Sequence, residues 1–217
     1  MTAIQHMMIQ GLKPMGIAVS PAQLAAMEIY GSELIAWNKK INLTAITHPR
    51  QIAEKHFIDS LAAARTMSGT SMLMDIGSGG GFPGLVLKIM NPEMTIVLVD
   101  SVRKKINFLK QIIRRLDLKN IEAVHSRIED LHADPAYTGR FDAVTSRAFA
   151  GLEKFTVLGH PFLCPGGTLY ALKGRQGETE ISQPVKNRYH ISIDRYRLPF
   201  EQSHRQVIQL TPHTQTD

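Results

Sequence analysis

The feature that most constrains the fold is a glycine-rich loop directly after an apolar segment. Residues Met72 to Gly84 read MLMDIGSGGGFPG. Glycine tolerates positive φ angles and lets a ligand approach bare backbone, so such a loop is suited to the floor of a binding site. A second apolar segment, TIVLV at 95–99, ends at another carboxylate, Asp100. Two strands, a glycine turn and an acid at the second strand tip together predict a nucleoside-binding pocket.

The spacing of the loop favours S-adenosylmethionine over a dinucleotide. The glycines of residues 79–84 satisfy the pattern G-x-G-x-x-G, which is typical of dinucleotide sites. In those sites the first glycine lies close to the strand end and a helix N-terminus faces a pyrophosphate. Here Asp75 occupies the strand tip and the turn begins at Gly77, and a carboxylate in that place repels phosphate. S-adenosylmethionine carries an ammonium, a sulfonium and no phosphate, so we expect it as the cofactor. A dinucleotide, or a turn that binds nothing, remains the alternative.

Length, charge and cysteine content indicate one globular protein. The 217 residues are 43% hydrophobic and 20% charged, which is ordinary for a chain that buries a full core. The one cysteine, Cys164, excludes an internal disulfide and a multi-thiolate zinc site. No apolar run approaches the ~18–20 residues that cross a bilayer, and no signal peptide is recognisable, so the sequence predicts a cytoplasmic protein. The net charge of +6 is compatible with nucleic acid and with small molecules as partners.

The segment before the glycine loop has a helical pattern. Ser20 and Pro21 are typical of a helix N-terminus, and apolar residues then recur at three- and four-residue steps as far as Ile41. A second helix is expected from about Pro49 to Met67. We therefore predict that residues 1–70 form a helical cap without strands.

From residue 71 onward, strand and helix patterns alternate, which is typical of a parallel sheet covered on both faces. After Lys173 we expect a helix and an antiparallel pair of strands, so residues 71–217 form an α/β domain. The expected strands are 72–76, 94–100, 120–124, 141–146, 167–172, 189–197 and 205–210.

The helix after Asp100 has an apolar stripe and several cations. Those cations form either a solvated face or a track for RNA, and the sequence leaves both interpretations open. The expected buried face is Val102, Ile106, Leu109, Ile113 and Leu116, and the cations are Arg103, Lys104, Lys105, Lys110, Arg114 and Arg115.

Polar residues gather where the predicted strands end. In an open sheet of this kind the ligand lies outside the carboxyl ends of the strands. Separate parts of the chain therefore converge on one site, through Asp75, Gly77, Asp100, Arg127–Glu129 and Ser146–Arg147.

Short motifs spanning about 37–174 occur in the order found in one known family. They are WNKKINLTAI (37–46), KHFIDS (55–60), DIGSGGGFPG (75–84), DSVRKK (100–105), SRIE (126–129), FDAVTSRA (141–148) and LKG (172–174). The glycine loop is shared with many methyltransferases, whereas the first two motifs are far more specific. The chain thus resembles the RsmG family, also called GidB, the ribosomal RNA small-subunit methyltransferases G.

The resemblance implies a Rossmann-like class I methyltransferase fold and S-adenosylmethionine as cofactor. It further implies transfer of a methyl group to N7 of guanosine 527, in the 530 loop of 16S ribosomal RNA. In the family, residues matching Gly77, Phe82, Ile128, Glu129 and Arg147 contact the cofactor. The expected cofactor site, including the acids and glycines of the loop, is Asp75, Gly77, Gly79, Phe82, Asp100, Ile128, Glu129 and Arg147.

Arg147 has three interpretations. At a strand tip, its guanidinium is suited to the methionine carboxylate of the cofactor or to an RNA phosphate, and it is also within reach of a structural pair with Asp142. Asn42 and Lys173 are candidate RNA contacts. The alternatives are that Asn42 caps a turn and that Lys173 is a solvated loop charge.

His56 and Asp59 lie three residues apart on one helix face, which resembles half of a metal site. No second pair with ligand spacing follows, so we expect no metal. The favoured interpretation is a hydrogen-bonded pair that ties the helical cap to the sheet.

The expected reaction needs little from side-chain chemistry. Guanine N7 has an in-plane lone pair and no proton to lose, so no general base or nucleophile is required and no catalytic residue is assigned. Alignment of the reactants supplies roughly 7–11 kcal/mol in favourable cases. A methyltransferase of a small molecule or protein, and a non-catalytic rRNA-binding assembly factor, remain as alternative functions. We expect a monomer.

Overall fold

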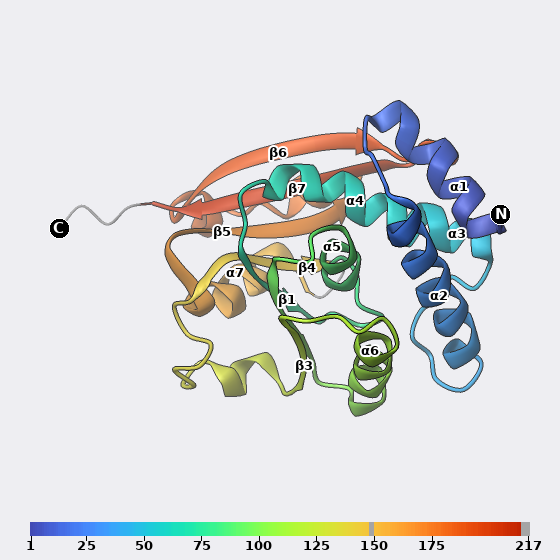
Figure 1. Cartoon of the computed structure of the whole chain (residues 1–217). Coiled ribbons are helices and arrows are strands. Elements are labelled where there is room, and N and C mark those ends of the chain that lie inside the picture. The colour runs from blue at the N-terminus through green and yellow to red at the C-terminus, as the bar shows by residue number, and fades with distance from the viewer. Residues whose placement is uncertain (148–149, 214–217) are drawn as a thin grey trace.

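A seven-stranded sheet forms the centre of the protein (Figure 1). The computed structural model describes residues 1–147 and 150–213. The strand order is β3-β2-β1-β4-β5-β7-β6, in which β1 to β5 are parallel and β7 runs antiparallel to β5 and β6. The strands are β1 (Met72–Ile76), β2 (Thr95–Asp100), β3 (Ile121–His125), β4 (Phe141–Arg147), β5 (Leu163–Gly174), β6 (Tyr189–Arg197) and β7 (His204–Pro212). The expected α/β fold, mostly parallel with antiparallel C-terminal strands, is confirmed.

The helices over 21–38 and 103–115 lie where the sequence pattern predicts them, whereas the N-terminal helix Ala3–Leu12 was not assigned from the pattern. The helix expected over 49–67 is interrupted by a π-helical stretch, Ala53–Ile58, which periodicity did not reveal. β5 begins earlier than expected, because Leu163 pairs with Phe141 ahead of an irregularity in the register. The α-helices are α1 (Ala3–Leu12), α2 (Pro21–Asn38), α3 (Pro49–Ile52), α4 (Asp59–Ala64), α5 (Gly84–Met90), α6 (Arg103–Arg115), α7 (Leu152–Gly159) and α8 (Gln183–Lys186).

Side chains alternate between the two faces of the sheet, and each face has its own hydrophobic cluster. Leu73 and Leu98 belong to the cluster that contains α5, α6 and the helices before β1. Their neighbours Met74 and Val99 belong to the cluster formed with α7 and with Val185 of α8. Because both faces are buried, the strand sequences are almost continuously apolar. The sheet is therefore the middle layer of three.

The helices of residues 1–67 pack on the sheet and contain no strand. The predicted N-terminus of α2 is confirmed, since the Ser20 hydroxyl accepts a hydrogen bond from the Gln23 backbone N–H and the Gln23 side chain accepts one from the Ser20 N–H. Across the interface, the buried Glu54 carboxylate accepts hydrogen bonds from the Phe200 and Glu201 N–H groups, both at 2.8 Å, in the turn between β6 and β7. The cap thus contacts the last two strands. Its division from residues 71–217 as a separate domain stays a prediction.

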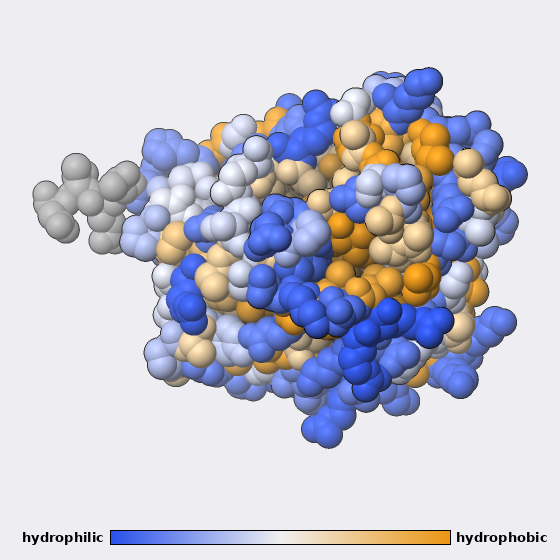
Figure 2. Space-filling model, viewed as in Figure 1, coloured by the Kyte–Doolittle hydropathy of each residue, from blue (hydrophilic) through white to orange (hydrophobic). Residues whose placement is uncertain are grey.

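Helix α6 differs in part from the expected pattern. Val102 was expected on the buried face, but its side chain is 43% exposed. It lies before the first helical turn with extended backbone, so the helical period does not apply to it. Figure 2 shows hydrophilic surface over α6, in agreement with its exposed cations. The fully buried residues are Ile106, Phe108, Leu109 and Ile112, whereas Ile113 and Leu116 are half-buried.

Among the residues that the structure describes, no helix combines the length and apolar character that crossing a membrane requires.

Candidate functional site

A pocket of about 350 Å³ opens at the carboxyl ends of β1, β2 and β3. It brings together four of the predicted cofactor residues, which span positions 77 to 129 of the sequence: Gly77, Asp100, Ile128 and Glu129. The remaining lining residues are Ile76, Val99, Ser101, Val102, Lys105, Ser126, Arg127 and Lys154. The predicted convergence of strand ends on one site is confirmed.

The glycine loop requires glycine at particular positions. Gly77, Gly79 and Gly81 have φ angles of 68°, 57° and 96°, in the left-handed region that other residues rarely adopt. The Gly77 N–H donates to the Val99 carbonyl at 2.8 Å, which holds the loop against the end of β2. A Cβ at Gly81 would lie 2.6 Å from the hydroxyl of Tyr30, whose O–H donates to the Gly80 carbonyl. The loop is thus fixed both by the sheet and by α2.

Asp100 is held rigidly at the tip of β2. Its Oδ2 accepts a hydrogen bond from the Gly79 N–H at 2.9 Å, and its Oδ1 accepts one from the Val102 N–H at 2.8 Å. Lys105 Nζ lies 3.9 Å from Oδ2. A carboxylate oxygen has two lone pairs, so each oxygen retains capacity to accept a hydroxyl group from a ligand. Asp100 therefore offers the pocket a positioned pair of acceptors.

Asp75 lies behind the loop and does not line the pocket. Its Oδ2 accepts a hydrogen bond from the Gly84 N–H at 2.9 Å, whereas its buried Oδ1 has no partner among the described residues. Burial raises the pKa of this carboxyl group to about 7. An acceptor without a donor is costly in the interior, which suits a nearby cationic ligand group. A role for Asp75 in cofactor binding stays a prediction.

Ile128 and Glu129 form the start of a 3-10 turn, Ile128–Leu131, directly after β3. The Ile128 side chain is buried in the hydrophobic cluster under α7, which gives this wall of the pocket an apolar surface. Glu129 lines the pocket beside it and is exposed. An apolar wall with an adjacent carboxylate is suited to the face and amino edge of a purine.

The side chains of Phe82, within the glycine loop, and of Arg147, at the end of β4, lie on the side of the cap. The Phe82 ring stacks on the His56 ring at a centroid distance of 4.3 Å and on the Tyr30 ring at 5.3 Å. The guanidinium carbon of Arg147 lies 5.0 Å from the Phe82 ring centroid. Neither residue lines the pocket. Their predicted contacts with the cofactor therefore stay predictions.

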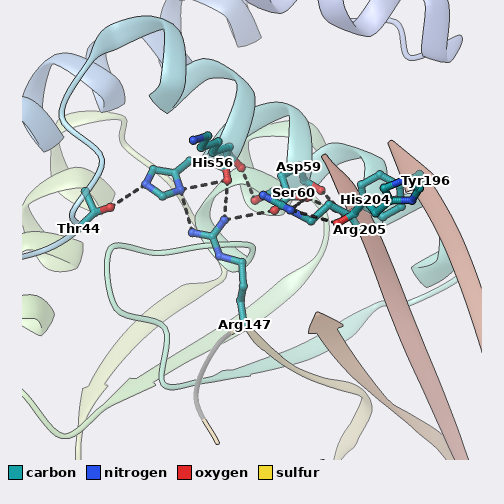
Figure 3. Close-up of polar contacts among 9 residues, drawn as sticks. Thr44, His56, Asp59, Ser60, Arg147, Tyr196, His204 and Arg205 are labelled. Carbon is teal, nitrogen blue, oxygen red and sulfur yellow. Dashed lines mark hydrogen bonds and ion pairs between the residues drawn. The ribbon is translucent and has the colours of Figure 1, made fainter. Parts of the chain in front are cut away.

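Arg147 does not pair with Asp142, so that interpretation was wrong. Arg147 Nη1 donates to the Lys55 carbonyl and Nη2 to His56 Nδ1, both at 2.9 Å, and Nη1 lies 3.6 Å from Asp59 Oδ2 (Figure 3). Asp142 instead accepts hydrogen bonds from Ser71, at the other end of its strand. Strand β4 separates the two residues by several rises of about 3.3 Å each, which sequence proximity concealed. Ala148, the last residue of that sequence motif, lies outside the described residues.

His56 and Asp59 tie the cap to the sheet, as predicted, although they do so through partners rather than through each other. Both contact Arg147 of β4, and Asp59 Oδ1 also accepts a hydrogen bond from Tyr196 at 2.9 Å and lies 3.5 Å from Arg205 Nε. Burial, together with the nearby Arg147, lowers the pKa of His56 to about 3. Over residues 1–147 and 150–213, no group of His, Cys, Asp and Glu side chains has the arrangement of a metal site.

The two remaining RNA candidates have different environments. Asn42 is exposed, and it is Asn38 that stabilises the turn, by accepting hydrogen bonds from the Leu43 and Thr44 N–H groups at 2.8 and 3.0 Å. Lys173 is only 12% exposed and lies 2.7 Å from Glu180, so the interpretation as a solvated charge was wrong. Contacts of Asn42 and Lys173 with RNA stay predictions.

Sequence reasoning missed two cations of the pocket as ligand-facing residues. Lys105 was grouped with the cations of either a solvated helix face or an RNA track, but it belongs to the first turn of α6, beside Asp100. Lys154 of α7 also lines the pocket, and nothing in its local sequence indicated this. The position of Lys105 in the first turn after a strand-end acid was a usable signal, whereas Lys154 required the tertiary fold.

The residues present fit S-adenosylmethionine. The Asp100 carboxylate suits two ribose hydroxyls, the wall at Ile128 and Glu129 suits an adenine, and the bare backbone at Gly77 allows close approach. The unpartnered oxygen of Asp75 and the cation of Arg147 suit the ammonium and carboxylate of an amino acid. The pocket walls carry three cations and two acids, so a dinucleotide is not excluded by charge alone.

Comparisons with known proteins decide between these ligands. The family model described as rRNA small subunit methyltransferase G matches residues 23–208. The ribosomal RNA small subunit methyltransferase G of Geobacter sulfurreducens is 40% identical over 206 residues, which are 93% of this chain and 94% of that protein. The protein of the same name from Desulfitobacterium hafniense is 44% identical over 172 residues, which are 79% and 72% of the two chains.

Solved structures support the fold. A SAM dependent methyltransferase from Aquifex aeolicus has a TM-score of 0.55 and 14% identity, covering 81% of this chain and 97% of that chain. The tRNA (m1A58) methyltransferase TrmI from Aquifex aeolicus has a TM-score of 0.57, also at 14% identity, covering 72% and 69%. The Rossmann-like methyltransferase fold is thereby confirmed. The chain belongs to the rRNA small subunit methyltransferase G family and is an S-adenosylmethionine-dependent methyltransferase.

Proposed function

We propose that the protein transfers a methyl group from S-adenosylmethionine to N7 of one guanosine of 16S ribosomal RNA, position 527 in the 530 loop. Membership of the family supports small-subunit rRNA as the substrate. The observation that carries the proposal is the Asp100 carboxylate, which is fixed by two backbone N–H groups at the mouth of a glycine loop. The choice of nucleotide and atom rests on the resemblance of the sequence motifs.

In the proposed reaction, the chain's own residues hold the reactants. Asp100 is positioned to accept hydrogen bonds from the ribose, and Ile128 and Glu129 to receive the adenine. When bound, S-adenosylmethionine supplies a methyl group already activated on a sulfonium. Because guanine N7 presents a lone pair and no proton, no side chain has to remove a proton. Positioning then supplies much of the rate, with roughly 7–11 kcal/mol available from orientation.

We further propose that the protein acts as a monomer in the cytoplasm. The pocket lining already includes the proposed ribose acceptor Asp100 and the proposed adenine wall at Ile128 and Glu129, so these contacts need no residue from a second copy. Cations are exposed on α6, and three more, Lys105, Arg127 and Lys154, line the pocket. This distribution of positive charge suits a large polyanionic partner.

The proposal is tested by methyl transfer to a defined substrate. The protein is incubated with radiolabelled S-adenosylmethionine and small ribosomal subunits from cells that lack this activity, and the label is mapped by nuclease digestion. We expect 7-methylguanosine at one site in the 530 loop, and much less label with Asp100→Ala at the same cofactor concentration. Label at another nucleotide would contradict the assigned position. Cofactor binding without label on subunits or free 16S RNA would shift the substrate to a small molecule or protein.

A further inference from the structure

The guanidinium of Arg147 is hydrogen-bonded to the π-helical stretch of the cap, Ala53–Ile58 (Figure 3). Its two terminal nitrogens donate to the Lys55 carbonyl and to His56 Nδ1, both at 2.9 Å. Phe82 of the glycine loop contacts both His56 and Arg147: its ring stacks on the His56 ring, and the guanidinium carbon of Arg147 lies over it at 5.0 Å from the ring centroid. His56 and Arg147 are therefore in direct contact, through Phe82, with the glycine loop that forms the pocket floor. π-helical turns of this kind are frequent at functional sites.

The chemistry of the partners fixes the tautomer of His56. A guanidinium only donates, so Nδ1 of His56 must accept and carries no proton. The ring proton is then on Nε2, which lies 2.9 Å from Thr44 Oγ1 and donates to it. Nδ1 also lies 3.2 Å from the Lys55 carbonyl, but an Nδ1 that accepts from Arg147 carries no proton to donate to that oxygen. His56 is therefore a neutral acceptor, and burial together with Arg147 lowers its pKa to about 3, so it remains neutral near pH 7.

A neutral partner leaves the charge of Arg147 under-compensated. Asp59 is the nearest carboxylate, at 3.6 Å, and it is shared with Arg205 at 3.5 Å. Lys55 pairs with Glu201 at 2.8 Å, so these two charges cancel. Asp75 also acts on Arg147, but burial raises its pKa to about 7 and reduces its charge near neutrality. Tyr196 remains un-ionised, because burial and Asp59 raise its pKa far above the usual value.

The Arg147 side chain also has an N–H group that its contacts with the cap do not use. Its Nε has no hydrogen-bond partner over the described ranges 1–147 and 150–213, and the side chain is 20% exposed. An excess of positive charge with an unused donor beside a ligand loop is suited to an anionic group. In the proposed reaction such a group is the methionine carboxylate of the cofactor or a phosphate of the RNA, which share this chemistry.

We propose that His56 is a positioning residue, which holds Arg147 through a neutral nitrogen so that the guanidinium keeps its charge for an anionic group of the reactants. A carboxylate in the place of His56 would hold Arg147 in position equally well but would neutralise it. The inference rests on the proposed function, and it adds a residue that does not line the pocket. Thr44 orients the ring, because its Oγ1 accepts a hydrogen bond from Nε2 of His56.

Three substitutions of His56 separate position from charge. His56→Gln keeps a neutral acceptor, His56→Leu removes the acceptor, and His56→Glu supplies a carboxylate. Each variant is compared with the wild-type protein by thermal melting, by calorimetric affinity for S-adenosylmethionine, and by kcat and KM for small subunits. Glu54→Gln is the matched control, because Glu54 joins the same stretch to the β6–β7 turn without contacting Arg147.

We expect His56→Gln to stay within about threefold of the wild type, and His56→Leu and His56→Glu to lose about tenfold or more, as when one charge-assisted hydrogen bond to a reactant is broken. His56→Glu should melt at least as high as His56→Leu, so that stability and function separate. Glu54→Gln should lower the melting temperature and leave kcat/KM unchanged. If the Leu and Glu variants lose affinity for S-adenosylmethionine, the anionic group that Arg147 binds is the methionine carboxylate. If only their KM for small subunits rises, the group is an RNA phosphate.

Two results would overturn the inference: wild-type affinity and turnover in His56→Glu, or equal losses in His56→Gln and His56→Leu. If His56→Glu does not fold, the comparison of the Gln and Leu variants still decides. Failure of the proposed function has a different signature. In that case the wild-type protein binds S-adenosylmethionine without labelling subunits, and the ratios of cofactor affinity among the variants still test His56.

Discussion

Asp100 Oδ2 accepts a hydrogen bond from the backbone N–H of Gly79 at 2.9 Å, so the tip of β2 holds the loop that follows β1. The same carboxylate accepts the Val102 N–H at the start of α6. One side chain therefore fixes two segments of the pocket wall and presents its remaining lone pairs to the ligand. Structure and binding are combined in a single group, and experiments on Asp100 have to separate them.

Asp100→Ala should weaken binding of S-adenosylmethionine by roughly 10- to 150-fold, since charge-assisted hydrogen bonds contribute about 1.5–3 kcal/mol. Asp100→Asn retains one acceptor and should lose less. Calorimetric titration measures both, and thermal melting reports any loss of the contacts with Gly79 and Val102. Asp117→Ala is the control, because Asp117 is exposed and pairs with Lys119 at the surface. Unchanged affinity in Asp100→Ala would refute the ribose role.

Gly84→Ala should destabilise the protein by about 1–3 kcal/mol, as overpacking of a dense interior does. An added Cβ would lie 2.4 Å from Leu98 Cδ2 and 2.9 Å from Asp75 Oδ2. Gly174→Ala is the matched control, because nothing lies within 4 Å of its Cβ position. Denaturant unfolding of both variants measures the difference. Equal stability of the two would mean that β1 and α5 adapt to the extra methyl group.

Asp75 should make the free energy of unfolding depend on pH. Burial raises its pKa from 3.8 to about 7 in the folded protein, so the native state binds the extra proton. Its contribution to stability is therefore fully present below about pH 4 and is lost as the pH rises through 7, with a slope of at most about 1.4 kcal/mol per pH unit. Asp75→Asn removes this contribution. Unfolding measured from pH 4 to 8 should show wild-type stability falling relative to the variant, and parallel curves would contradict the shifted pKa.

The exposed cations of α6 should contribute to RNA affinity through counterion release. Arg103, Lys104 and Lys110 are exposed and form no ion pair with any residue of 1–147 or 150–213. Replacing all three by Gln should make the dependence of log affinity on log salt shallower, by about 0.7–0.9 for each phosphate that is no longer neutralised. Filter binding to small-subunit RNA at several salt concentrations measures the slope. Substitution of Lys186 and Arg188, before β6 at the opposite edge of the sheet, is the control. A slope that stays unchanged in the α6 variant would identify these cations as a solvated face.

The strands were predictable because burial on both faces makes their sequences apolar runs. Gly77 and Asp100 were predictable because a turn with positive φ favours glycine and because a carboxylate at the tip of a strand stands out against the apolar run before it. The buried face of α6 was predicted only in part. Helical periodicity gave Ile106 and Leu109, but it failed at Val102, which precedes the first turn.

Contacts between distant segments were beyond sequence reasoning. The only protein partner considered for Arg147 was an acid five residues away on the same strand, whereas the actual partners, His56 and Asp59, come from a helix about ninety residues earlier. No local pattern encodes which helix covers a strand tip. The π-helical stretch that brings Lys55 and His56 together was hidden for the same reason, because its apolar spacing resembles that of an α-helix.

The bond between Glu54 and the β6–β7 turn has a consequence for biosynthesis. The carboxylate is made early, but the two N–H groups that satisfy it follow 146 and 147 residues later. A nascent chain that ends before Phe200 therefore exposes the inner side of its first helices, since enclosing an acid without donors is costly. We therefore expect the contact between the helix of Glu54 and the β6–β7 turn to form late in folding, after residues 200 and 201 have been synthesised.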